Sequence, residues 1–179
     1  AKSLKSIAII GPNADQVQFG DYTWSRNNKD GVTPLQGIKN RVNKNTAIHY
    51  AKGCSLTSLD TSGIAEAVEA AKNSEVAVIF GGSASAALAR DYKSSTCGEG
   101  FDLNDLNLTG AQSQLIREVY RTGTPVILVL VTGKPFVIEW EKNNLPAILV
   151  QWYAGEQAGN SIADILFGEV VPSGRLTFS

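Results

Sequence analysis

The chain carries continuous apolar runs separated by stretches with helical spacing. Residues 6–11, 75–82, 124–131 and 146–152 are such runs, and residues 47–51 form a shorter, weaker one. A short apolar run closed by glycine or by Gly-Pro is typical of a parallel strand with both faces covered. The pattern therefore predicts a mainly parallel sheet.

Between these runs, apolar residues recur every three or four positions. Residues 64–71 and 158–166 predict two helices, and Pro34 and Pro135 each suit a first helical turn. The segment 109–112 has the form of a capping box, which predicts a helix that starts there and ends at Gly123. Alternation of strands and helices predicts an α/β sheet with helices on its faces.

Two long irregular segments interrupt this alternation, at residues 12–33 and 83–107. Loops of this length in a compact domain are usually functional or disordered. Both follow strands of the predicted parallel sheet, so both are expected at its carboxyl edge, where open α/β sheets bind ligands.

Glu99 is the main candidate for chemistry in the second segment. It lies between Gly98 and Gly100, which allow backbone turns that other residues resist. A glutamate suits proton transfer because burial by a substrate can raise its pKa towards neutrality. The alternative is a solvated polar loop with ordinary ion pairs. Other charged residues of this segment are Arg90, Asp91 and Asp102.

The first segment carries Asp21, Tyr22 and Trp24. Exposed aromatic rings suit sugars, whose apolar faces stack on them while the hydroxyls bind polar neighbours. Alternatively, Tyr22 and Trp24 anchor the loop to this domain or to a neighbouring one.

Composition narrows the function classes. The 179 residues are 43% hydrophobic and 18% charged, with a formal net charge of −1, which fits a single globular domain over residues 1–179 and gives no reason to expect nucleic acid or a membrane as partner. No apolar run is long enough to cross a bilayer. One histidine, His49, and two cysteines make a Ser-His-Asp triad or a metal site improbable, so any chemistry must rest on carboxylates.

Several segments together resemble the second domain of glycoside hydrolase family 3, the β-glucosidase and β-xylosidase family. The similar segments are residues 7–15, 20–22, 33–38, 97–110 with its Gly-Glu-Gly-aromatic-Asp motif, 152–160, 166–168 and 172–176. Each is weak alone, but the ordered set is specific and covers nearly the whole chain.

The resemblance implies a three-layer α/β/α sandwich with about six strands, mostly parallel, and one antiparallel edge strand. It implies that an N-terminal (β/α)8 barrel of the same polypeptide supplies an aspartate nucleophile, while Glu99 is the acid/base of a retaining β-glycosidase, with no metal or organic cofactor. Many relatives carry arginine where this chain has Leu103. The other charged residues of the segment, Arg90, Asp91 and Asp102, are therefore carried over only as subsite candidates, like Tyr22 and Trp24.

On this basis we expect the chain to be a fragment of a longer exo-acting enzyme on oligosaccharides or aryl and alkyl β-glycosides, with β-glucosidase favoured and the fragment alone inactive. A chain that starts at Ala1 without methionine, and stops directly after a strand-like segment, agrees with a fragment. The rival interpretations are a non-catalytic scaffold for the barrel and a small-sugar binding module. A periplasmic or secreted location is favoured by analogy alone.

Overall fold

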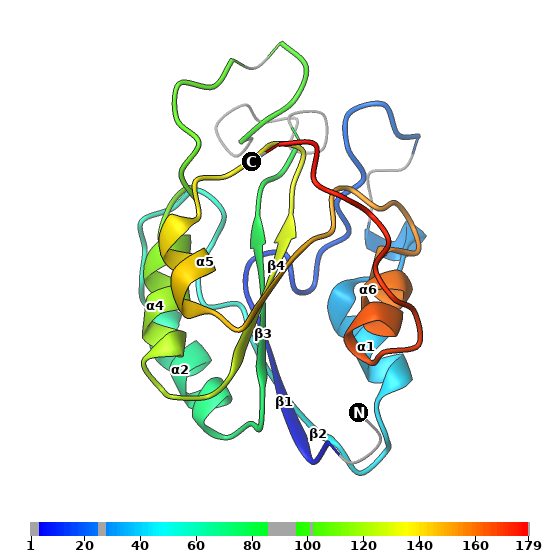
Figure 1. Cartoon of the computed structure of the whole chain (residues 1–179), viewed down its shortest axis with the longest axis vertical. Coiled ribbons are helices and arrows are strands. Elements are labelled where there is room, and N and C mark those ends of the chain that lie inside the picture. Colours follow the sequence, from blue (N-terminus) through cyan, green and yellow to red (C-terminus); the bar gives the residue numbers. More distant parts are fainter. Residues whose placement is uncertain (1–3, 25–27, 86–95, 101, 179) are drawn as a thin grey trace.

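The computed structural model describes residues 4–24, 28–85, 96–100 and 102–178, which contain a five-stranded sheet (Figure 1). The strand order is β2-β1-β3-β4-β5, and all four neighbouring pairs are parallel. The strands are β1 Ser6–Ile10, β2 Ala47–Ala51, β3 Ala77–Gly82, β4 Val126–Val131 and β5 Ala147–Val150. Each lies within one of the five apolar runs, as predicted.

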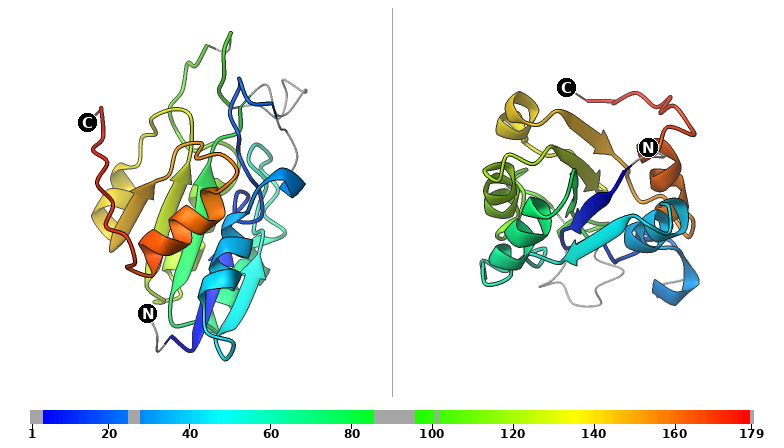
Figure 2. Two further views of the ribbon diagram at one scale, coloured as in Figure 1. Left: turned by 90° about the vertical axis from the view of Figure 1, so that its right-hand side faces the viewer. Right: turned by 90° about the horizontal axis from the view of Figure 1, so that it is seen from below.

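Helices cover both faces of the sheet, so the three-layer α/β/α sandwich is confirmed (Figures 1 and 2). One face carries α1 and α6, which pack against each other, and the other carries α2, α4 and α5. The helices are α1 Pro34–Arg41, α2 Ile64–Lys72, α4 Gln112–Tyr120, α5 Glu139–Asn144 and α6 Ala158–Leu166, and a 3-10 turn, η1, covers Asn28–Asp30.

Alternate residues of each inner strand enter opposite cores. In β1, Ile7 and Ile9 join the core under α1 and α6, whereas Ala8 and Ile10 join the core under α2 and α4. All four are at most 2% exposed. This double burial explains why the strand appears in the sequence as an unbroken apolar run rather than as an alternating one.

The predicted antiparallel edge strand is wrong for the part of the chain that the structure describes, where all five strands are parallel. After α6 the chain continues from Val170 to Phe178 without strand pairing. Pro172 has no N–H that could join a sheet hydrogen bond. Val171 and Leu176 are 83% and 58% exposed, so this segment also lacks the burial of a strand.

Two local helix signals also differ from the structure. Pro34 starts α1 as predicted, and the Thr33 side chain accepts from the Gln36 N–H. Pro135, however, does not start a helix, because Thr132 closes a turn with Lys134 just before it and α5 begins only at Glu139.

The predicted capping box at 109–112 is absent as well. Helix α4 begins at Gln112 with no side-chain cap. The Gln112 amide donates to the carbonyl and hydroxyl of Thr109, and it also binds both the N–H and the carbonyl of Gly82 at the end of β3.

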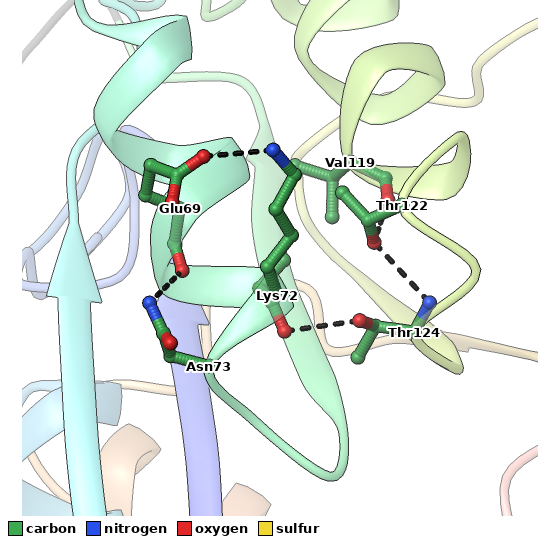
Figure 3. A network of polar contacts seen from close by, with 7 residues as sticks. Glu69, Lys72, Asn73, Val119, Thr122 and Thr124 are labelled. Atoms are coloured by element: carbon green, nitrogen blue, oxygen red, sulfur yellow. Dashed lines mark hydrogen bonds and ion pairs between the residues drawn. The ribbon is translucent and has the colours of Figure 1, made fainter.

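At the amino end of the sheet, polar contacts join α2 to the connection between α4 and β4 (Figure 3). Thr124 donates through its hydroxyl to the Ala71 carbonyl over 2.9 Å, and its N–H donates to Thr122, whose hydroxyl reaches the Val119 carbonyl. These contacts satisfy helix-end carbonyls. They lie at the opposite end of the sheet from both long loops (Figure 1).

Candidate active site

The chain order of the sheet reverses beside β1, since β2 lies on one side of it and β3 on the other. Ligands of open α/β sheets bind outside the carboxyl ends of the strands at such a point. Asn13, which follows β1, is fully buried next to this point. The Asn13 side-chain amide donates to the carbonyls of Gly81 and Ser83, and its oxygen accepts from Gln18 over 2.8 Å.

The connection that carries Glu99 is closed at its base. Ser85 and Cys97 form an isolated parallel β-bridge. Next to it, the Thr96 N–H donates to the Ala84 carbonyl over 3.0 Å, and the Ala84 N–H donates to the Thr96 hydroxyl over 2.9 Å. The residues on both sides of the segment 86–95 are therefore held together directly above β3.

Glu99 is exposed, and the loop that follows β1 reaches it. The Tyr22 hydroxyl donates to Glu99 Oε2, and the Glu99 N–H donates to Asp21 Oδ2 over 2.6 Å. The hydroxyl of Ser85 donates to the other oxygen of Asp21. Both loops follow strands at the carboxyl edge of the sheet, as predicted, and the structure adds that they meet at Glu99.

Tyr22 is 85% exposed, so it does not anchor its loop to the core of this chain. Its hydrogen bond to Glu99 is the main reason why the pKa of the Tyr22 phenol is raised, and desolvation and the charges of Glu99 and Asp21 add to it. A phenol that keeps its proton remains a donor to the carboxylate.

Tyr153, on the connection between β5 and α6, lies under both loops. Its hydroxyl is 2.8 Å from Ser83 Oγ and 3.0 Å from Cys97 Sγ. Its ring packs against Gly20 and Gly133, where a side chain would collide with it or touch it. Burial raises the pKa of the Tyr153 phenol well above its ordinary value. This neutral side chain therefore connects the ends of β3 and β4 with the base of the Glu99 loop.

Among the described residues, neither Trp24 nor Asp102 forms a hydrogen bond with Glu99. Trp24 is fully exposed, at 101%, and lines an open hollow of about 470 Å³ together with Phe19, Asp30 and Glu156. Asp102 is exposed. Arg90 and Asp91 lie outside the described residues.

The sequence singled out Glu99 and Tyr22, which the structure brings into contact, but it did not point to Ser85 or Tyr153, and it took Asp21 only as a polar neighbour of the aromatic rings. Ser85 gave no local signal. Within residues 4–24, 28–85, 96–100 and 102–178, no group of three or more histidine, cysteine, aspartate or glutamate side chains could hold a metal ion. None of the helices described is long and apolar enough to span a bilayer.

Known proteins of one family match this chain over nearly its whole length. The sequence profile of the glycosyl hydrolase family 3 C-terminal domain matches residues 1–179. A β-xylosidase of Formosa agariphila is 40% identical over 98% of this chain and 24% of its own length, and a periplasmic β-glucosidase of Salmonella typhimurium is 36% identical over 99% and 25%. The chain thus spans about a quarter of these relatives.

A solved structure shares the fold. The exo-β-xylosidase of glycoside hydrolase family 3 in complex with a xylobiose aziridine activity-based probe superposes with a TM-score of 0.83 at 29% identity. The match covers 98% of this chain and 22% of that one.

Proposed function

The chain belongs to glycosyl hydrolase family 3 as its C-terminal domain, and from this premise we propose that it supplies the general acid/base, Glu99, of a retaining exo-β-glycosidase. The complete enzyme would be about four times as long as this chain, because the chain matches 24% and 25% of two relatives. The nucleophile and most contacts to the first sugar would come from an N-terminal barrel in that additional length.

The contacts of Glu99 are the observation that supports this role. Its backbone N–H is bound by Asp21, its Oε2 is bound by Tyr22, and the side chain is still exposed at the carboxyl edge of the sheet. An acid/base must be oriented, yet open to the scissile bond. An ordinary solvated carboxylate needs no such contacts from a second loop.

Glu99 would act twice. Its carboxyl group would protonate the leaving glycosidic oxygen while the barrel aspartate forms the glycosyl-enzyme, and its carboxylate would then take a proton from the water that releases the sugar. In a retaining enzyme the two carboxyl groups lie about 5–5.5 Å apart. The exposed ring of Trp24, beside its hollow, would stack on the leaving group.

The substrates would carry a terminal β-linked xylose or glucose, since the relatives include both β-xylosidases and β-glucosidases. Parallel assays with aryl β-xylosides and aryl β-glucosides would choose between them. The isolated 179-residue chain is expected to hydrolyse neither, because it lacks the nucleophile, and turnover by this fragment would contradict the proposal.

The decisive experiment replaces Glu99 by Ala and by Gln in the complete enzyme. A substrate with a good leaving group, such as a dinitrophenyl glycoside, is compared with one that has a poor leaving group, such as an alkyl glycoside. General acid catalysis is worth about 10²–10⁴-fold. We expect a loss of that order on the poor leaving group, a much smaller loss of the glycosylation rate on the good one, and rescue of the latter's turnover by azide.

Asp60→Asn is the matched control, because the Asp60 carboxylate accepts hydrogen bonds within its own loop, from the N–H and the hydroxyl of Ser62. Near-normal rates on both substrates after Glu99→Gln would show that the domain is a scaffold for the barrel. Calorimetry of the isolated chain with glucose and xylose tests the third interpretation, a sugar-binding module, and we expect no heat of binding.

A further inference from the structure

We propose that Asp21 is a positioning residue for Glu99, acting together with Ser85. The proposal rests on the proposed function, because it assigns Asp21 to the orientation of the same acid/base. Asp21 lies in the loop after β1, whereas Ser85 and Glu99 belong to the connection after β3.

Both oxygens of the Asp21 carboxylate are used. Oδ2 accepts from the Glu99 backbone N–H over 2.6 Å, and Oδ1 accepts from the Ser85 hydroxyl. Ser85 is 1% exposed and pairs with Cys97 in the β-bridge at the base of the connection. One side chain therefore joins the backbone of Glu99 to a rigid point at the end of the sheet.

The backbone around Glu99 cannot provide this rigidity. Gly98 has φ of +136° and Gly100 has φ of +69°, and a side chain at Gly100 would meet nothing within 4 Å. Glycine gains conformational freedom that other residues lack, so this segment loses more entropy than others when it is fixed. The direction of Glu99 must therefore be set by contacts from outside its own segment.

Asp21 and Tyr22 provide two such contacts from adjacent positions. Asp21 holds the backbone of Glu99, and Tyr22 holds a carboxylate oxygen. The two contacts differ in exposure, since Asp21 is half-buried and Tyr22 is 85% exposed. Both oxygens of Asp21 already accept from Glu99 and Ser85, so its proposed role is to orient Glu99 rather than to bind substrate.

The test uses the complete enzyme with Asp21→Ala, Asp21→Asn and Ser85→Ala. A misplacement of about 1 Å can cost on the order of 10²-fold in rate. We expect Asp21→Ala to lower the rate on an alkyl glycoside by roughly 10- to 100-fold. The glycosylation rate on a dinitrophenyl glycoside should change by less than about threefold, because an activated leaving group needs little protonation.

Asp21→Asn is the conservative variant. Its oxygen can still accept from the Glu99 N–H, and its amide can donate to Ser85, whose hydroxyl can act as acceptor. We therefore expect it to retain most of the rate on the alkyl glycoside. Asp60→Ala is the control, since Asp60 also receives a backbone N–H and a serine hydroxyl, but both come from Ser62.

A double-mutant cycle separates orientation of Glu99 from a general loss of structure. If Asp21 acts through Glu99, then Asp21→Ala in a Glu99→Ala background causes no further loss on the alkyl glycoside. Multiplicative losses, or equal losses on both substrates, would overturn the proposal. If Glu99→Ala alone shows no selective loss, the proposed function of Glu99 has failed; if it does and Asp21→Ala does not, only the role of Asp21 has failed.

Discussion

Replacing Gln112 by methionine tests how the end of β3 is fixed. Gln112 is 1% exposed, and its side chain accepts from the Gly82 N–H over 2.8 Å and donates to the Gly82 carbonyl over 3.0 Å. Its amide also donates more weakly to the carbonyl and hydroxyl of Thr109, over 3.2 and 3.3 Å, and to the Leu56 carbonyl, which keeps a second donor in the Thr109 hydroxyl at 2.6 Å. Methionine has a similar length and helix propensity, so the change removes hydrogen bonds without opening a large cavity.

The expected cost follows from the two groups of Gly82 that lose this partner. A buried donor or acceptor without a partner costs about 1–3 kcal/mol, so the loss at both groups of Gly82 should lower the free energy of unfolding of Gln112→Met by about 2–6 kcal/mol. Urea denaturation of the 179-residue chain, followed by circular dichroism, would measure this change.

Gln114→Met is the matched control, since Gln114 is exposed on the same helix and its substitution should stay within about 0.5 kcal/mol. Equal effects of the two substitutions, or a loss below about 1 kcal/mol for Gln112→Met, would refute the view that this amide holds the strand end.

Three further predictions concern stability. Gly37→Ala would place a Cβ 2.0 Å from the Gly159 carbonyl oxygen, where α1 and α6 touch, and should cost on the order of 3 kcal/mol in thermal or urea unfolding; an unchanged stability would mean that the helices separate freely. Burial raises the pKa of the Cys54 thiol from 9.0 to about 11. The contribution of this thiol to the free energy of unfolding should therefore be fully present below about pH 9, and on the order of 2 kcal/mol of it should be lost as pH rises towards 11. Cys54→Ala should remove that part of the alkaline loss, and an identical pH profile would contradict the assignment. Tyr153→Phe removes the hydroxyl that binds Ser83 and should cost about 1 kcal/mol, measured by the same unfolding assay, since Ser83 keeps other partners; a neutral result would show that the hydroxyl contributes nothing.

The sequence was a good guide to the sheet because each strand is covered on both faces. Ile7 to Ile10 alternate between two cores, and such a run has no polar positions that would resemble a helix or a loop. The antiparallel edge strand came from the resemblance and not from any apolar run, and it is the part of the sheet that differs among the described residues.

Local signals failed where distant residues compete for the same polar groups. Thr109 and Gln112 have the spacing of a capping box, but the Gln112 amide binds Gly82, which is 30 residues away in the sequence. A hydrogen bond between residues so far apart cannot be predicted from the four residues of a capping box. The helix predicted to begin at Pro135 is absent for a different reason. A turn in which Thr132 binds Lys134 comes directly before Pro135, and α5 begins only at Glu139.

The candidate site shows the same division. Glu99 stood out as a candidate because its two flanking glycines are a local signal, and Tyr22 because it is an aromatic residue in a long loop. The contact between Asp21 and Glu99 joins residues 78 positions apart, and the link to Ser85 spans 64. Only the topology, which puts the ends of β1 and β3 side by side, brings them together.

The β-bridge between Ser85 and Cys97 has a consequence for how this domain can diversify. Because Ser85 and Cys97 pair at the two ends of the connection between them, a change in its length leaves these ends paired, and each doubling of a loop's length costs only about 0.6 kcal/mol. Insertions and deletions between positions 85 and 97 should therefore be inherited at little cost to the placement of Glu99. Under the proposed function, the leaving-group preference could then change through this connection while Glu99, the proposed acid/base, keeps its placement.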